Sequence, residues 1–133
     1  AKFDTYRNQE LSAVNHVADI YSSLLNNIEG LTIPTVPDGY YSSWAQYTVQ
    51  LPEKCDRTKI QTELKSLGIP TNIYYIKPMH KQGAFCNSYS SLADCPTTEK
   101  LCNTVLCLPI HPYLEDYEVE FIAENFKSLV QNC

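Results

Sequence analysis

The order of segments predicts a small α/β domain of the two-layer α+β type, in which helices cover a short sheet. Apolar residues recur every three to four positions in residues 5–28 and 115–131, which is the spacing of amphipathic helices. Residues 44–51 alternate apolar and polar side chains, and residues 105–108 are a continuous apolar run; both patterns are typical of strands. Elements that alternate in this way bury their apolar faces by packing helices on a sheet.

The first expected element is a long helix over residues 5–28, ended by Gly30. His16 lies off its apolar stripe, so we expect this side chain to be solvated. The stripe, which we expect to face the core, consists of Leu11, Val14, Ala18, Tyr21, Leu25 and Ile28.

A loop rich in proline follows in residues 31–41, and then the first strand, residues 44–51, which Pro52 stops. Its alternation places Ala45, Tyr47, Val49 and Leu51 on one face. Asp56 is a good N-cap for a helix that runs to about residue 67. Gly68 and Pro70 then end that helix, because glycine adopts the left-handed conformation and proline cannot continue the helix.

The second half of the chain predicts two further strands and two helices. Residues 71–76 are β-branched and aromatic, which favours a second strand. Residues 83–93 lack periodicity and are expected to form a loop. Pro96 suits the first turn of a short helix to about residue 104, ahead of the strand at 105–108. The last helix, residues 115–131, carries acidic residues in its first turn, which complement the helix dipole. Three strands are therefore expected.

Composition limits the possible functions. The 133 residues make one domain, 1–133, and include 10 basic and 15 acidic residues, for a formal net charge of −5. Such a balance argues against a nucleic-acid groove, which needs clustered lysine and arginine, but not against a phosphorylated small molecule. No apolar run approaches the ~20 residues of a membrane span, and the first residues are no signal peptide. We expect a cytoplasmic protein with no membrane partner.

The six cysteines are expected to be free thiols. A disulfide framework is typical of short, loop-rich chains, whereas this chain has ample aliphatic residues for a core. A zinc site needs closely spaced cysteine pairs, which are lacking. Disulfides and a metal site remain the alternatives for Cys55, Cys86, Cys95, Cys102, Cys107 and Cys133.

Within residues 71–82, an expected strand leads into a polar loop. The loop gathers hydrogen-bonding and cationic side chains around Pro78, and loops of this kind at strand ends are favoured places for ligand contact. The candidate binding residues, which all lie in this stretch, are Tyr74, Tyr75, His80 and Gln82.

Three landmarks of the sequence resemble the C-terminal part of the DegT/DnrJ/StrS family of PLP-dependent sugar aminotransferases. Members read G-I-P-T, two hydrophobic residues and H-Y-P-x-P-L-H-x-Q where this chain has residues 68–82. Residues 108–112, L-P-I-H-P, match the family's L-P-[ML]-H-P, and residues 44–47, W-A-Q-Y, match its [WY]-x-x-Y strand. The landmarks occur in the family's order and spread over most of the chain.

The resemblance implies the small domain of the aspartate-aminotransferase-like fold, entered through the long first helix. It further implies a longer, homodimeric parent enzyme that transfers an amino group, with glutamate as donor, to a nucleotide-linked keto-sugar. The cofactor, pyridoxal 5'-phosphate, would be bound by a large domain that this chain lacks. The chain's start, which shows no beginning of a domain, suits a piece of a longer protein.

The resemblance also assigns roles to the candidate residues. Tyr75 takes the place of the family's tyrosine and Tyr74 that of its histidine, while His80 and Gln82 follow the pattern. A phenol donates to a sugar hydroxyl or a phosphate oxygen but does not take up a proton near neutral pH, as imidazole does. Gln46 is a further candidate for the same cleft, and we expect His111, flanked by prolines, chiefly to fix a turn.

No lysine of the chain lies in a motif that marks the Schiff-base lysine of such enzymes, so we expect no catalytic residue and no cofactor-binding residue here. The first alternative is a free-standing small-molecule-binding or regulatory module whose loop binds an anion. The second is a structural half of a dimer interface, with the long first helix as its contact. The upstream reading frame discriminates between them and the enzyme.

Overall fold

The structure, a computed structural model that describes residues 2–85 and 94–133, is a small α+β domain with a long first helix, as the sequence predicts. The helical segment begins with α1 (Phe3–Thr5), widens into a π-helical stretch (Tyr6–Glu10) and continues as α2 (Leu11–Leu25). The order continues with β1 (Tyr47–Gln50), α3 (Arg57–Ser66), α4 (Pro96–Thr104), β2 (Val105–Leu108) and α5 (Asp116–Gln131). Two short 3-10 turns, Met79–Lys81 and Gly83–Phe85, precede α4.

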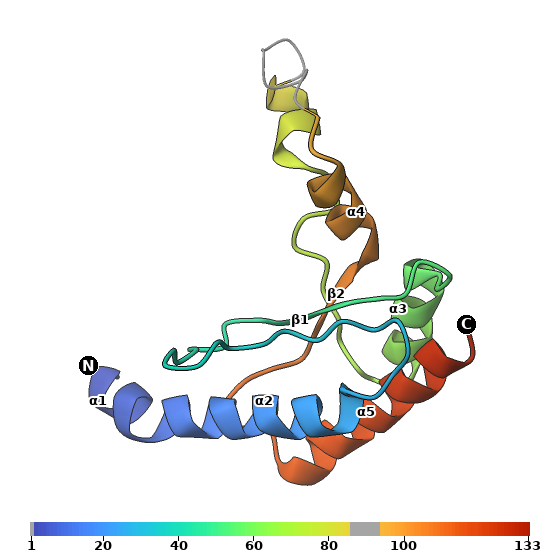
Figure 1. The fold of residues 1–133 in the computed structure, drawn as a ribbon. Helices are drawn as coiled ribbons and strands as arrows, with labels where there is room; N and C mark the ends of the chain where they lie inside the picture. Colours follow the sequence, from blue (N-terminus) through green and yellow to red (C-terminus); the bar gives the residue numbers. More distant parts are fainter. Residues whose placement is uncertain (1, 86–93) are drawn as a thin grey trace.

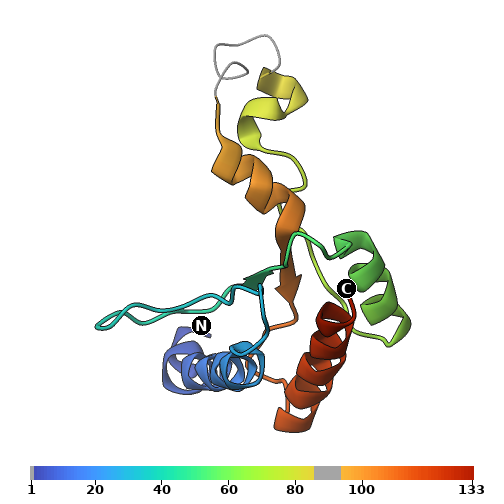
Figure 2. The same ribbon diagram turned by 45° about the vertical axis from the view of Figure 1, so that its right-hand side comes forward.

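The sheet is a two-stranded antiparallel ladder, with Tyr47 opposite Leu108 and Gln50 opposite Val105. The helices α2, α3 and α5 pack around it, while α4 and the 3-10 turns project away beyond the end of the ladder at which β2 begins (Figures 1 and 2). We call this projection, residues 78–85 together with α4, the arm.

The core lies between the ladder and the three helices. Tyr47 and Val49 of β1 are fully buried, as the alternation predicts, and the polar side chains of the strand point to the opposite face. The predicted stripe of the first helix is buried except for the half-buried Leu11. The other core residues that are at most 1% exposed come from α2, α3, β2 and α5: Val17, Ala18, Tyr21, Leu25, Leu64, Leu106, Val119, Ala123, Phe126 and Val130.

The helix ends follow the predicted local chemistry. Asp56 caps α3 by accepting hydrogen bonds from the backbone N–H groups of Thr58 (2.9 Å) and Lys59 (3.1 Å). Gly68 closes the same helix with a φ of 79°, and Glu115 opens α5 in a capping box with Glu118. The ends at Asp56 and Gly68 are predicted from sequence because each depends on neighbours only a few residues away, whereas the capping box is a finding of the structure.

The strand expected at residues 71–76 is reduced to a single bridge between Asn72 and Cys107. After that bridge, the side chains of Tyr74, Tyr75 and Ile76 are 52–72% exposed. The prediction of a regular strand there was wrong, because strand propensity reflects packing on a half-buried surface, and this segment leaves the sheet. β1 is likewise shorter than residues 44–51, since Trp44 has a φ of 45°, which interrupts extended backbone.

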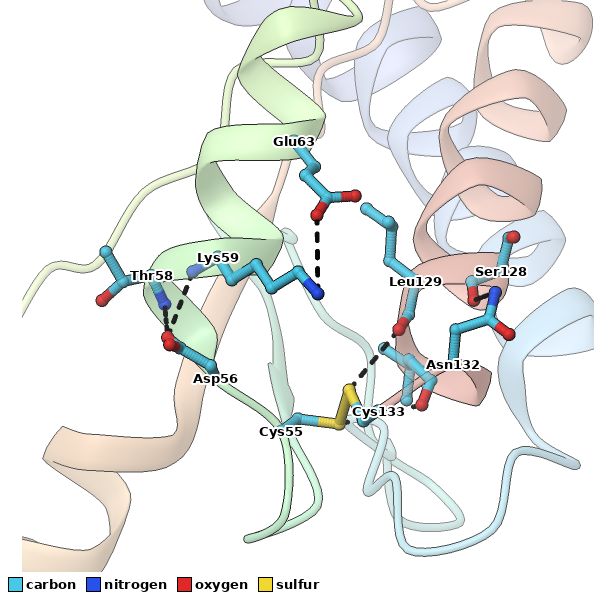
Figure 3. Close-up of a disulfide and its surroundings, with 10 residues drawn as sticks. Cys55, Asp56, Thr58, Lys59, Glu63, Ser128, Leu129, Asn132 and Cys133 are labelled. Carbon is cyan, nitrogen blue, oxygen red and sulfur yellow. Dashed lines mark hydrogen bonds and ion pairs between the residues drawn. A yellow bond between two sulfur atoms is a disulfide. The ribbon is translucent and has the colours of Figure 1, made fainter.

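The prediction that all cysteines are free was also wrong. Cys55, just before α3, forms a disulfide with Cys133, just after α5, across 78 residues of sequence (Figure 3). The pairing arises because α3 and α5 pack side by side, which sequence spacing does not reveal. Cys95, Cys102 and Cys107 are free, and Cys86 lies outside the described residues.

We expect Cys133→Ser to lower the free energy of unfolding of the oxidised chain by about 2–4 kcal/mol, because the cross-link restricts the unfolded ensemble. Urea unfolding followed by circular dichroism measures the difference. Under a strong reductant the wild type and the variant should converge. Equal stability without reductant would contradict the predicted contribution of the disulfide.

Candidate functional site

The candidate site is a cleft of about 230 Å³ on the edge of the sheet, which we call the sheet-edge cleft. Its lining joins the residues before β1, the segment after α3 and the loop after β2. These are Ala45, Gln46, Pro70, Asn72, Tyr74, Cys107, Leu108, Pro109, Ile110 and His111. All three motifs singled out in the sequence therefore contribute residues to it, among them Gln46, Tyr74 and His111.

Backbone hydrogen bonds hold the three walls of the cleft together. The Asn72 N–H donates to the Cys107 carbonyl (3.1 Å), and the Cys107 N–H donates back (2.9 Å), which fixes the segment that carries Tyr74 against β2. The third wall is fixed from the core, where the buried Tyr21 hydroxyl donates to the carbonyl of Pro109 at 2.8 Å. Burial raises the pKa of this phenol, so it stays a neutral donor.

The polar groups in the cleft are neutral hydrogen-bonding side chains. His111 Nδ1 accepts the backbone N–H of Tyr113 at 3.2 Å, so the neutral ring carries its proton on Nε2. That bond fits the expectation that His111, flanked by two prolines, fixes a turn. The same residue also lines the cleft. Apolar walls, Pro70, Leu108 and Ile110, face these groups. Neutral donors among apolar walls suit the hydroxyls and C–H groups of an uncharged ring.

Cys107 contributes a thiol to the cleft wall, but not a nucleophile. Its side chain is buried, and burial raises the pKa of the thiol above the ordinary value, while a contact with Thr48 Oγ1 (3.0 Å) acts in the opposite direction. The thiol is therefore protonated at neutral pH, and only the thiolate is a good nucleophile.

The four candidate residues of the polar loop are divided between the cleft and the arm. Tyr74 lines the cleft, and the next side chain, Tyr75, is 66% exposed. His80 is only 8% exposed and turns into the arm, where its Nε2 lies 3.3 Å from Glu99 Oε1. Gln82 makes a long hydrogen bond, 3.5 Å, from Nε2 to the carbonyl of Lys77. The structure brings only Tyr74 of the four into contact with the cleft.

Glu99 of α4 organises the arm. Its carboxylate pairs with Lys81 Nζ at 2.5 Å as well as with His80. Hydrogen bonds from Lys81 and, next, from His80 hold the pKa of Glu99 below its ordinary value. At the base of the arm, Arg57 of α3 donates to the carbonyls of Cys102 (2.6 Å) and Val105 (3.1 Å), which fixes α4 to the body of the domain.

The residues of the sheet-edge cleft do not fit pyridoxal phosphate. No lysine or arginine is among its lining residues, so it offers neither an amine for a Schiff base nor a cation for the phosphate. Residues 2–85 and 94–133 also hold no cluster of three side chains able to bind a metal ion. Within the same ranges, every helix is too short or too polar to cross a membrane.

Comparison with known proteins defines the family. The model of the DegT/DnrJ/EryC1/StrS aminotransferase family matches residues 7–127, so the chain belongs to that family and the resemblance seen in its motifs is confirmed. It is 35% identical over 119 residues to dTDP-4-dehydro-2,3,6-trideoxy-D-glucose 4-aminotransferase of Saccharopolyspora spinosa, covering 87% of this chain and 29% of the relative. It is 32% identical over 115 residues to UDP-2-acetamido-2-deoxy-3-oxo-D-glucuronate aminotransferase of Pseudomonas aeruginosa, covering 86% and 30%.

Solved structures of the family share the fold. A DegT DnrJ EryC1 StrS aminotransferase from Brucella abortus is 31% identical, with a TM-score of 0.78 over 91% of this chain and 31% of that chain. A Streptococcus pneumoniae protein described as a sugar aminotransferase, in its PLP-form, is 25% identical and has a TM-score of 0.76. The match covers 92% of this chain and 32% of that chain. The predicted fold class is thereby confirmed. The chain spans about 30% of the length of the relatives it matches.

We expect Glu99→Gln to loosen the arm in a pH-dependent way. A carboxyl whose pKa is lowered in the folded state stabilises the fold at pH values above its ordinary pKa of 4.5. This stabilisation is lost as the pH falls through the lowered pKa. The Tm of the variant should therefore lie below that of the wild type at about pH 7, and the gap should close by about pH 3.

Glu63→Gln is the matched control, because its pair with Lys59 is a 3.9 Å contact between exposed side chains on α3. It should leave the Tm nearly unchanged at both pH values. A Tm difference between the wild type and Glu99→Gln that is the same at both pH values would contradict the proposed role of the Glu99 charge.

Proposed function

We propose that the chain is the C-terminal small domain of a PLP-dependent aminotransferase that acts on a nucleotide-linked keto-sugar, with glutamate as the amino donor. The observation that carries the proposal is the convergence of the three family motifs on one cleft, where Gln46, Tyr74 and His111 meet. Residues far apart in sequence meet there through the pairing of β1 with β2 and the Asn72–Cys107 bridge. The two relatives described above are named as aminotransferases of nucleotide-linked sugars, which supports the substrate class.

The role of the cleft follows from its chemistry. Its polar side chains are two amides, a phenol, a thiol and an imidazole, and no aspartate, glutamate, lysine or arginine is among the lining residues. Such groups exchange hydrogen bonds with sugar hydroxyls, while the apolar walls contact the faces of the ring. We assign the cleft to the sugar rather than to the diphosphate, with the exposed Tyr75 beside it as a second hydroxyl for the substrate. His80 and Gln82 act from the arm, by shaping the loop that carries both tyrosines.

In this proposal pyridoxal phosphate is held outside the chain, by a large domain of a cytoplasmic, homodimeric parent. The cofactor supplies the amino-group chemistry when bound, and this chain's residues bind and orient the sugar. Tyr74, which stands where the family has histidine, donates a hydrogen bond and leaves proton transfer to other groups. The alternative, a free-standing binding module, is tested by the upstream reading frame: a large α/β domain with a Schiff-base lysine supports the enzyme.

We expect the isolated chain to form no specific covalent adduct with pyridoxal phosphate. Treatment with the cofactor, reduction with borohydride and peptide mapping should find no lysine modified stoichiometrically, because none lies in the cleft. Denatured chain serves as the control for non-specific labelling. A single stoichiometric site, especially Lys77 or Lys81, would contradict the division of labour between domains.

We expect Tyr74→Phe and Tyr75→Phe in the full-length parent each to lower kcat/KM for the sugar-nucleotide half-reaction by about three-fold to a hundred-fold. This range corresponds to the loss of one hydrogen bond worth about 0.5–3 kcal/mol. The half-reaction with glutamate should change less. Single-turnover absorbance of the cofactor separates the two half-reactions.

Tyr117→Phe is the matched control, since Tyr117 is an exposed tyrosine of α5 that does not line the sheet-edge cleft. It should leave both half-reactions unchanged. If the two loop variants behave like Tyr117→Phe, the tyrosines do not contact the substrate. If they lose both half-reactions together with Tm, their role is in packing.

A further inference from the structure

The Cys55–Cys133 disulfide joins two helix termini of opposite polarity. Cys55 directly precedes Asp56, the N-cap of α3, while Cys133 follows the last turn of α5 (Figure 3). The N-terminus of a helix carries a partial positive charge and the C-terminus a partial negative one. The two sulfur atoms of one bond therefore lie in different electrostatic surroundings.

The two cysteine residues differ in their exposure to solvent. Cys133 is exposed and Cys55 is half-buried. A cleft of about 330 Å³ lies beside Cys133, and it is lined by Lys54, Asp56, Lys59, Ile60, Glu63, Leu129, Asn132 and Cys133. A cleft of this size admits the cysteinyl part of a small thiol, and Cys133 is the cysteine in its wall.

Four charged side chains face this cleft. Lys59 pairs with Glu63 at 3.9 Å, and the Asp56 carboxylate is directed to the N–H groups at the start of α3. Lys54 has no ion-pair partner among the described residues. A negatively charged thiolate that approaches the cleft is therefore attracted by Lys54 and repelled chiefly by Asp56.

The polarity of the helix ends determines which sulfur leaves. A thiolate released on Cys55 lies at the positive end of α3, which stabilises its charge. Both sulfurs lie near the last carbonyls of α5, since Cys133 Sγ is 3.4 Å from the carbonyl oxygen of Leu129 and Cys55 Sγ is 3.7 Å from that of Val130. The start of α3 is therefore the feature that distinguishes the surroundings of Cys55. In thiol–disulfide exchange the better-stabilised thiolate is the better leaving group. Access and electrostatics thus favour the same direction of attack.

We propose that the Cys55–Cys133 disulfide is a thiol-exchange site, at which a small thiol of the glutathione class forms a mixed disulfide with Cys133. The incoming thiolate attacks Cys133 Sγ, the bond to Cys55 breaks, and Cys55 takes the electron pair as thiolate. A second thiolate then attacks the small-molecule sulfur of the mixed disulfide, which frees Cys133. In sum, two thiols are oxidised to their disulfide and the protein disulfide is reduced to two thiols.

Glutathione added to the oxidised 133-residue chain tests the proposal. After acid quenching and alkylation of new thiols, trypsin cleavage after Lys54, Arg57 and Lys127 places the two cysteines in separate peptides, residues 55–57 and 128–133. We expect glutathione on Cys133 and alkylation on Cys55, with this isomer exceeding its reverse by about ten-fold or more. Three outcomes would each overturn the proposal. The first is that peptides 55–57 and 128–133 are not disulfide-linked before treatment. The others are that neither cysteine carries glutathione, or that most of the glutathione is on Cys55.

Two variants test the electrostatic basis without disturbing the cap or the fold. Asp56→Asn keeps an N-cap side chain but removes the negative charge, so exchange should become about two- to five-fold faster. Lys54→Gln removes the attracting charge and should slow exchange by a similar factor. Equal rates for all three proteins, or the opposite order, would contradict the assigned polarity.

Discussion

Antiparallel pairing of β1 with β2 is the constraint on which the rest of the domain depends. The two strands are distant in sequence, and their register sets Tyr47 against Leu108 and Val49 against Leu106. These four side chains are at most 3% exposed and form the floor on which α2, α3 and α5 pack. Because side chains alternate across a strand, the same register turns Thr48 and Cys107 to the other face, next to the cleft. Core and site are thus two faces of one ladder.

Much of this could be predicted from sequence where short-range chemistry determines the structure. The cap at Asp56 and the left-handed Gly68 depend on residues within one helical turn. The buried stripe of α2 follows from helical periodicity, and the buried face of β1 follows from alternation. The family resemblance then supplied the order of the motifs that meet in the cleft.

The rest could not be predicted, because it depends on contacts between distant segments. Residues 71–76 have the composition of a strand, but only Asn72 finds a bridge partner. The Cys55–Cys133 bond requires α3 to lie beside α5, and His80 turns inward because Glu99, on another element, accepts a hydrogen bond from its Nε2. Gln46 and His111 carried weak signals in sequence, and the structure places both on the cleft that Tyr74 also lines.

Trp44 shows how the position of the cleft is set from a distance. Its left-handed backbone, unusual for a large side chain, is held by a hydrogen bond from Nε1 to Asn15 of α2 (3.0 Å) and by a ring contact with Tyr47 (centroids 5.5 Å apart). Asn15 also donates to the carbonyl of Ser42 at 3.0 Å, so one amide fixes the chain on both sides of Ser43. Gln46 follows Trp44 by two residues. A change on α2 that frees this tryptophan would therefore alter the direction from which Gln46 enters the cleft. If the cleft holds the sugar, as proposed, the long helix influences how the substrate fits as well as supporting the sheet.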